Sequence, residues 1–226
     1  MFPLGPIMQL FHEIGRGMPG MLSKIGLGTF MDARNGGGKL NQLTAEQGED
    51  LVKYIPDFEG EDYLWYTLPK LNVAFLRASS ADPHGNISID KEAEEIEVLS
   101  VAQAVKSSGG IVICQVDELV ELHTVNPHMI KVPGIYIDYI VVAQDREAIP
   151  QNMARTKGAT YEPAFTGEVL KEVKTEVASV PLNERKVIAR RAALELGPGY
   201  NVNMGLGMPT TIPMILAEAG VDDKIT

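Results

Sequence analysis

The chain has 226 residues, of which 45% are hydrophobic and 22% are charged, the usual balance of a globular protein with a buried core. Its 30 acidic and 20 basic residues give a formal net charge of -10, which argues against nucleic acid as a partner because no basic stripe could neutralise phosphates. No apolar run approaches the roughly 18 residues that cross a bilayer, so we expect no membrane partner.

The first twenty residues, MFPLGPIMQLFHEIGRGMPG, lack the basic region and the small-residue cleavage site of a secretory signal. They predict a helix with Ile7, Leu10, Phe11 and Ile14 on one apolar face. No earlier element of the sequence could cover this face, which suggests that further residues precede it. The single cysteine, Cys114, excludes an internal disulfide framework, favours a cytoplasmic location and is expected to be a buried core thiol.

Three apolar runs in the middle of the chain predict strands, at Leu71–Ala78, Gly110–Val116 and Ile135–Ala143. Because these runs are nearly continuous, we expect strands that are covered on both faces. EAEEIEVLSVAQAVKSSGG, between the first two runs, has helical spacing and ends at Gly109. A strand, a helix and a strand of this length predict a βαβ unit, and therefore an α/β fold with open, mainly parallel sheets.

The polar segment 146–181 is broken by Pro150 and Pro163 and is interpreted as a linker or excursion between domains. LNERKVIARRAALELGPG then predicts a helix with Asn183 as its N-cap and Ile188, Ala192 and Leu196 on one face. A strand, YNVNMG, a glycine turn and a helix, TTIPMILAEAG, follow. The closing VDDKIT is expected to begin another strand.

The glycine turn, in YNVNMGLGMPTTIP, has two explanations on its residues alone. Gly205 and Gly207 would let a backbone approach a ligand closely, at the N-terminus of a helix with free N–H groups. A tight turn that serves packing alone explains the same residues equally well. A dinucleotide fingerprint would need a third glycine where the chain has Thr210.

Four stretches, in this order, resemble motifs of the family I coenzyme A transferases, in particular the acetate/propionate CoA-transferase type. Gly26–Thr44, GLGTFMDARNGGGKLNQLT, resembles the motif G-x-G-T-F-x-D-x-R…G-G-K-x-N, and Ala78–Ser88, ASSADPHGNIS, resembles A-D-x-x-G-N. VPGIYIDYIVV resembles P-x-I-Y-x-D, and RRAALELGPGYNVNMGLGMPTTIP is similar to R-R-A-A-x-E…N-x-G-x-G-x-P. The resemblance covers almost the whole chain.

This resemblance implies most of a first CoA-transferase domain at 1–145, a linker or excursion at 146–181 and the beginning of a second domain at 182–226. Family members are longer, with an N-terminal glycine loop and a catalytic Glu shortly after the second-domain glycine turn. The resemblance therefore implies that this nucleophile lies just beyond Thr226, and that the chain is a fragment, inactive when isolated. An incomplete reading frame or a split subunit would have the same consequence.

The chemistry that the resemblance implies is CoA transfer between acyl-CoA and a small carboxylic acid, through a glutamyl-CoA thioester. Coenzyme A is then a substrate, and no cofactor or metal is implied. A homo-oligomer is expected for the full-length protein. Eight residues are expected to line the CoA and acyl site: Gly5, Gly36, Gly37, Gly38, Gly205, Gly207, Met208 and Pro209.

Three features of the sequence qualify these expectations. Some family members have P-Q-G where this chain has Pro3, Leu4 and Gly5, so a side-chain donor is replaced by leucine and the backbone N–H of Gly5 is left as the candidate donor. A flexible surface loop remains the alternative for the three consecutive glycines. Glu218, in LAEAG, lacks the family's E-[NS]-G context and is interpreted as part of a solvated helix face.

The remaining alternative from another class is a Rossmann-type NAD(P)-binding module that uses the Gly205 turn. The four histidines, His12, His84, His123 and His128, lack metal-ligand spacing and are interpreted as structural or surface residues.

Overall fold

The computed structural model describes the whole chain except residues 146–150, 152–159, 171–178, 206 and 222–226. The chain forms two compact units, Met1–Leu170 and Lys171–Thr226, and each is described by itself. In the described residues no helix is long and apolar enough to cross a membrane.

The first unit begins with helix α1, Leu4–Gly15, followed by a three-stranded antiparallel sheet in the order β1-β3-β2. Its strands are β1 Met21–Ser23, β2 Val52–Phe58 and β3 Glu61–Tyr66, and the connection from β1 to β2 carries the 3-10 turn η1, Ala33–Asn35, and helix α2, Gln42–Gln47. This sheet is not predicted by sequence pattern, because its strands mix apolar and charged residues over short runs. Its core is formed by Leu10, Met21, Met31, Val52, Leu64 and Tyr66.

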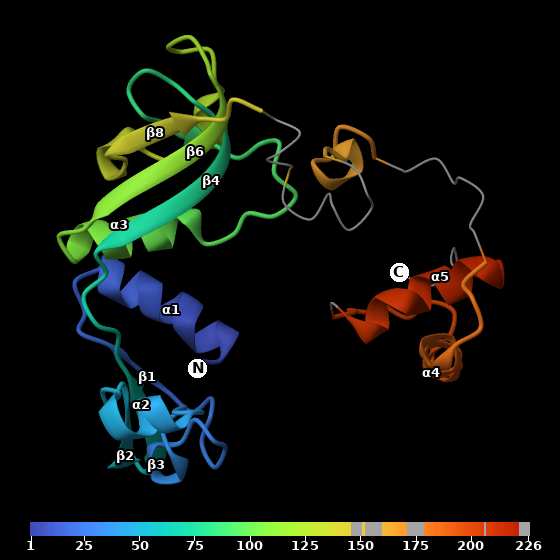
Figure 1. Ribbon diagram of the computed structural model, residues 1–226, viewed down its shortest axis with the longest axis horizontal. Helices are drawn as coiled ribbons and strands as arrows, with labels where there is room; N and C mark the ends of the chain where they lie inside the picture. Colours follow the sequence, from blue (N-terminus) through green and yellow to red (C-terminus); the bar gives the residue numbers. More distant parts are fainter. Residues whose placement is uncertain (146–150, 152–159, 171–178, 206, 222–226) are drawn as a thin grey trace. The chain divides into compact units, whose positions relative to one another are not determined.

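The apolar face of α1 packs in part against later elements of the chain. Leu10 is fully buried in the core of the small sheet, and Ile14 packs against the same core. On its other side α1 packs against helix α3, Val98–Ser107, where a Cβ on Gly15 would lie 3.0 Å from the Gln103 Cβ. Figure 1 shows α1 between α3 and the small sheet.

The second sheet of this unit has five strands in the order β7-β5-β4-β6-β8. They are β4 Val73–Ala81, β5 Ile87–Ser88, β6 Ile111–Leu119, β7 Ile130–Val132 and β8 Tyr139–Val142. The three predicted strands are β4, β6 and β8, and the predicted βαβ unit is confirmed, because β4 and β6 pair in parallel and α3 lies between them in the chain. The sheet as a whole is mixed: β4, β6 and β8 are parallel to one another, as predicted, whereas β5 pairs antiparallel with both β4 and β7.

The short turns of this unit are η2 Pro127–Met129, η3 Gly134–Tyr136 and η5 Pro163–Phe165. Most of the predicted linker, 146–181, lies outside the described residues. Gln151, within it, is buried, donates to the Lys91 carbonyl at 2.7 Å and accepts the Glu162 N–H at 2.8 Å. The described residues of this segment up to Leu170 therefore belong to the first unit, and residues 179–181 belong to the second.

The second unit contains helix α4, Glu184–Ala193, the turn η6, Met208–Thr210, and helix α5, Thr211–Glu218. Asn183 caps α4 as predicted, accepting the Lys186 N–H at 2.9 Å. The helix ends earlier than predicted. The backbone N–H groups of Glu195 and Leu196 donate to carbonyls three residues earlier, so the last turn has the tighter hydrogen bonding of a 3-10 helix.

Two further predictions for this unit are wrong. The buried face of α4 is formed by Lys186 and Ala189, whereas Ile188 is exposed. Residues 200–205 form no strand. The strand predicted at the end of the chain lies largely outside the described residues.

Candidate functional site

The glycine loop of the first unit is organised around the carboxylate of Asp32, which is fully buried. Asp32 accepts the Gly28 N–H at 2.9 Å and the Arg34 N–H at 3.0 Å. The Arg34 guanidinium donates to the same carboxylate from Nε at 2.9 Å and from Nη2 at 2.6 Å. These bonds from Arg34, helped by the Gly28 N–H, hold the pKa of Asp32 well below its usual range although burial opposes them.

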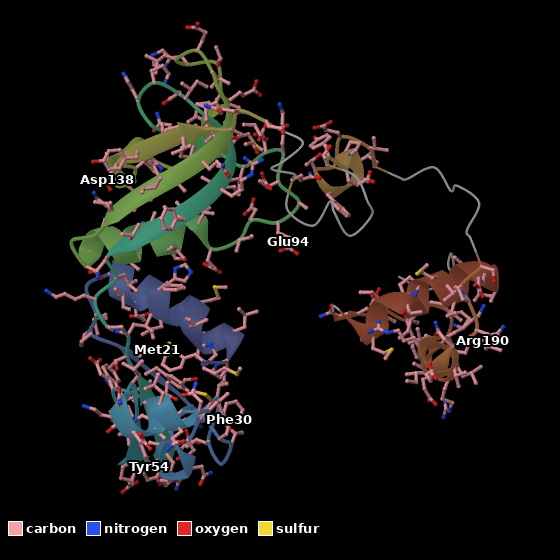
Figure 2. The ribbon with its side chains drawn as sticks, viewed as in Figure 1. Met21, Phe30, Tyr54, Glu94, Asp138 and Arg190 are labelled. Carbon is pink, nitrogen blue, oxygen red and sulfur yellow. The ribbon has the colours of Figure 1, made fainter. Side chains whose placement is uncertain are left out.

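The other face of Arg34 lies over an aromatic ring, with its guanidinium carbon 3.8 Å from the centroid of Tyr54 in β2. Tyr54 in turn donates to Asp62 in β3 at 2.5 Å. Figure 2 labels Tyr54 in the small sheet and Phe30 on the loop that leads to Asp32. The half-exposed Arg34 thereby links the buried Asp32 of the loop to Tyr54 of the sheet.

Gly36, Gly37 and Gly38 all have positive φ, of 110°, 59° and 77°. The Gly37 N–H donates to the Asp32 carbonyl at 3.0 Å and the Gly38 N–H to the Phe30 carbonyl at 2.9 Å. A Cβ on Gly38 would lie 2.5 Å from the Met1 carbonyl oxygen. The three glycines therefore serve a defined left-handed turn that side chains rarely adopt, and two of their amides bond within the loop.

A hollow of about 490 Å³ lies beside this turn. Gly36 and Gly37 line it together with Lys39 and Lys53, and Lys39 pairs with Asp50 at 2.6 Å. Two lysines and one aspartate give this hollow a positive balance among its charged lining residues, which suits an anionic group.

The start of α1 lies next to the glycine loop, because the Met1 ammonium donates to the Gly38 carbonyl at 2.9 Å. Gly5 is the second residue of α1, so its N–H has no acceptor within the helix. A Cβ on Gly5 would meet nothing within 4 Å, so packing does not require glycine there. The structure thus brings two parts of the predicted site, Gly5 and the loop, to one side of the first unit.

The second glycine turn belongs to the other unit. Gly207 has φ 108° and ψ −125°, a conformation that only glycine adopts readily. Its carbonyl accepts the Thr210 hydroxyl at 2.6 Å, which closes η6 before α5 begins. Gly205, Met208 and Pro209 flank this turn, and Leu206 lies outside the described residues.

Glu218, at the end of α5, is not on a solvated helix face as predicted. Its carboxylate pairs with the Lys186 ammonium at 2.9 Å, and the exposed fractions of the two side chains are 15% and 9%. It also accepts the Val180 N–H, while Lys186 donates to the Val180 carbonyl at 2.5 Å. The hydrogen bond from Lys186 lowers the pKa of Glu218. This carboxylate joins α4 to α5.

Cys114 is confirmed as a core thiol. It is fully buried in β6, and burial raises the pKa of its thiol to about 12. Within the described part of the chain no group of three or more His, Cys, Asp or Glu side chains could hold a metal ion.

Two other motifs hold the larger sheet together. Asp82, in ADPHGN, accepts the N–H groups of His84 and Asn86, at 2.9 and 3.0 Å. The Asn86 side-chain oxygen accepts the Gly134 N–H at 3.0 Å, and so ties this turn to the second motif, PGIYID. Asp138 of that motif accepts the Val112 N–H and the Lys106 ammonium, both at 2.7 Å. Their role in the structure is to fix turns and strand ends.

Neither Asp32 nor Arg34 is among the predicted site residues. The motif D-x-R, separated from three glycines by Asn35 alone, is a signal for them in the sequence. An Asp carboxylate can accept the backbone N–H of the residue two positions later, as in an Asx turn. When that residue is Arg, the carboxylate can also pair with the guanidinium.

Comparison with known proteins places the chain in a family. The model of the coenzyme A transferase family matches residues 1–143, more than half of the chain. The chain therefore belongs to the coenzyme A transferase family.

Individual relatives agree with this assignment. The chain is 47% identical over 224 residues to the caffeate CoA-transferase of Acetobacterium woodii, and 35% identical over 222 residues to the acetate CoA-transferase YdiF of Escherichia coli K12. It is similar, with a TM-score of 0.80 and 32% identity, to the acyl-CoA transferase YdiF of E. coli O157:H7 solved as a thioester complex with CoA.

The matches cover unequal shares of the two partners. They include 99% of this chain but 41% of the caffeate enzyme and 42% of the solved YdiF chain. The chain thus spans about two fifths of the length of these relatives.

Proposed function

We propose that this chain is part of an enzyme that moves coenzyme A between a short-chain acyl-CoA and a carboxylic acid through a glutamyl-CoA thioester. The observation that carries the proposal is the 47% identity to a CoA-transferase over 99% of the chain. The 0.80 TM-score to a CoA-transferase solved as a thioester complex supports it from the fold.

The proposed reaction has two reversible halves. A glutamate carboxylate attacks the thioester carbonyl, CoA thiolate leaves, and a mixed anhydride forms. The thiolate then attacks the glutamyl carbonyl, which releases the first carboxylate and leaves CoA on the enzyme as a thioester. A second carboxylate attacks this thioester, and the same steps in reverse order release its acyl-CoA and restore the glutamate.

We propose that the nucleophilic glutamate lies in polypeptide beyond Thr226. Glu218 is the glutamate nearest in the sequence to the expected position, and it is held by Lys186 and by the Val180 N–H. The Glu218 carboxylate is occupied by an ion pair and a hydrogen bond that join α4 to α5. It is therefore a poor candidate for a nucleophile, which must be free to attack the thioester carbonyl. The isolated chain is therefore expected to be inactive.

The eight predicted site residues receive these proposed roles. Gly5 offers a helix N-terminal N–H to the oxyanion of the tetrahedral intermediate. Gly36 and Gly37 form part of the wall of the lysine-lined hollow, which would receive an anionic part of CoA or the carboxylate substrate, and Gly38 completes the turn that holds them. The turn formed by Gly205, Gly207, Met208 and Pro209 shapes the acyl pocket.

The experiment is a CoA-exchange assay on the 226-residue chain and on the full-length gene product. With acetyl-CoA as donor and propionate, then caffeate, as acceptors, the full-length protein is expected to turn over and the isolated chain is not. Turnover by the isolated chain would refute the location of the nucleophile. An inactive full-length protein with every acid tested would count against the activity itself.

Two substitutions separate the nucleophile from the ion pair. Glu218→Gln in the full-length protein is expected to leave the transfer rate unchanged and to weaken the packing of α4 on α5. Lys186→Met is the matched control, because it breaks the same ion pair without touching the carboxylate. A loss of activity with Glu218→Gln but not with Lys186→Met would assign Glu218 to catalysis.

The alternative of an NAD(P)-binding module loses its main support, because no strand precedes the Gly205 turn at residues 200–205. The fingerprint requires a strand, a glycine turn and a helix in succession.

A further inference from the structure

The glycine loop contains a pair of residues whose order in the chain favours a covalent change. Asn35 is followed directly by Gly36, and the sequence has no other Asn-Gly pair. In such a pair the backbone nitrogen of the glycine can attack the side-chain amide of the asparagine, because glycine has no Cβ to hinder the approach. In a folded protein the attack further requires a mobile asparagine side chain and a free glycine nitrogen.

The side chain of Asn35 is accessible and weakly held. Asn35 is exposed and is the last residue of η1. Its Nδ2 donates to the Thr29 carbonyl at 3.2 Å, at the long end of the range for such a bond. Among the described residues, its Oδ1 accepts no hydrogen bond. One long, exposed hydrogen bond contributes little, so the side chain can rotate toward Gly36.

The backbone nitrogen of Gly36 is also free. On either side of it, the N–H groups of Asn35 and Gly37 both donate to the Asp32 carbonyl, at 2.8 and 3.0 Å. The Gly36 N–H donates to no acceptor in the part of the chain that the structure describes. A Cβ built on Gly36 would meet no atom within 4 Å, so there is room for the reaction. No hydrogen bond therefore has to break before this nitrogen attacks.

We propose that Asn35 is a site of spontaneous deamidation in the folded protein, with the Gly36 nitrogen as the nucleophile. This nitrogen loses its proton to water and bonds to the Asn35 Cγ, and ammonia leaves, which forms a succinimide ring. Water then opens the ring. Attack at the side-chain carbonyl leaves an aspartate at position 35, and attack at the main-chain carbonyl leaves an isoaspartate. The net change consumes one water, releases ammonia and converts an amide into a carboxylate without oxidation or reduction.

The change alters the charge beside the lysine-lined hollow. Either product adds a negative charge next to Gly36, which lines the hollow together with Lys39 and Lys53. The isoaspartate also lengthens the main chain by one methylene group directly before the left-handed turn. We expect both effects to weaken the binding of an anion in the hollow. This consequence for CoA rests on the proposed function, whereas the deamidation itself does not.

Asn41 provides a matched control in the same loop. It is exposed, its side chain caps α2 by accepting the Thr44 N–H at 2.8 Å, and Gln42 follows it in the sequence. Trypsin cleaves after Arg34 and Lys39, so the two asparagines lie in separate peptides. Their conversion can thus be followed in one digest of the same protein.

Peptide mapping of the full-length gene product tests the proposal. The folded protein is kept at neutral pH, and samples taken over days are digested beside a fresh sample and analysed by mass spectrometry. The proposal expects Asn35 to convert at least about tenfold faster than Asn41, because a free glycine nitrogen lowers the barrier of the attack. Equal rates at the two positions would overturn it. Conversion of Asn35 only after unfolding in urea would overturn it as well.

Asn35→Gln is the variant that isolates the ring-forming step. Glutamine keeps an exposed amide but must form a larger ring with the Gly36 nitrogen. We expect conversion at position 35 to fall to the level of Asn41 or below. Conversion of the glutamine at the rate of the parent asparagine would contradict the succinimide route.

A kinetic comparison tests the effect on the hollow. Asn35→Asp, which carries the charge of the product, is compared with the neutral Asn35→Gln in CoA transfer by the full-length protein. The KM for acyl-CoA is expected to be at least about twofold higher in Asn35→Asp, because the added charge opposes that of the lysines. Equal KM values would refute the effect on binding. A fresh parent protein without activity would count against the proposed function, while the peptide map still decides the deamidation.

Discussion

Asp32 shows at the level of single residues how a motif becomes a loop. Its buried carboxylate accepts two backbone N–H groups and the Arg34 guanidinium, and its carbonyl accepts the Gly37 N–H. We expect Asp32→Asn to lower the free energy of unfolding by about 1–3 kcal/mol, because a charged acceptor of several hydrogen bonds is lost in a buried position.

Urea denaturation of the two proteins measures this difference. Asp50→Asn is the matched control, because Asp50 also pairs with a cation, Lys39 at 2.6 Å, but its side chain is 80% exposed. Exposed ion pairs contribute little, so the control is expected to unfold at nearly the same urea concentration as the parent. Equal losses in the two variants would show that the ion pair of Asp32 has no special role.

The same carboxylate predicts a pH dependence. The pKa of Asp32 is lowered in the folded protein, chiefly by the hydrogen bonds from Arg34. Its contribution to stability is therefore present above the pKa of the unfolded chain, about 3.9, and is lost as the pH falls below that value. The stability difference between the parent and Asp32→Asn should be constant from neutral to mildly acidic pH and should shrink in stronger acid. A difference that grows in acid would contradict the assignment.

At the scale of elements, two of the site glycines of the first unit, Gly38 and Gly5, should respond oppositely to substitution by alanine. Gly38→Ala forces a Cβ against the Met1 carbonyl oxygen in a residue with φ 77°. Gly5 lies in α1 with free space around its Cα, so Gly5→Ala should stabilise the helix, by about 0.5–1 kcal/mol.

Thermal unfolding of both variants tests this prediction, and the assay of the full-length protein adds a functional readout. Gly5→Ala retains the backbone N–H, so it should retain CoA transfer if that N–H is what the site uses. A lower melting temperature for Gly5→Ala than for the parent would contradict this prediction, because it would require an atom in close contact with the added Cβ.

In the second unit, Gly207→Ala is expected to be destabilising and Gly205→Ala close to neutral. Gly207 has a backbone conformation that alanine reaches only at a cost of about 1–3 kcal/mol, whereas Gly205 has open space for a Cβ. Circular dichroism during heating compares the two. Should Gly205→Ala prove the more damaging change, the turn would be held by contacts other than its backbone conformation.

Sequence patterns predicted the elements that carry long apolar periodicity. The helix at the start, the strands β4, β6 and β8, the helix between them and the Asn183 cap were all indicated by local signals. Local patterns do not predict the small antiparallel sheet, because strands such as Val52–Phe58 contain charged residues among the apolar ones. These strands are stabilised by pairing, here with Glu61–Tyr66, and local patterns do not encode that contact.

The candidate site could be predicted in part. The motifs predict the glycines, but the backbone conformation of the glycines and the burial of the Asp32 carboxylate depend on how the loop packs on β2 and β3. Glu218 was placed on a solvated face because a helical pattern does not show that Lys186, 32 residues earlier, reaches it across the helix pair.

At the scale of the whole molecule, the chain belongs to the coenzyme A transferase family but matches only part of the length of its relatives. The chain matches CoA-transferases over 99% of its own length but over 41–42% of theirs. In the proposed enzyme, polypeptide outside these residues supplies the nucleophile.

The most direct measurement of the central claim is the location of the covalent intermediate. The full-length gene product is incubated with acyl-CoA, and the thioester-bearing peptide is identified by mass spectrometry. The account predicts one glutamate carrying CoA, in a peptide outside residues 1–226. A CoA adduct on Glu218, or on any other carboxylate within these residues, would contradict it.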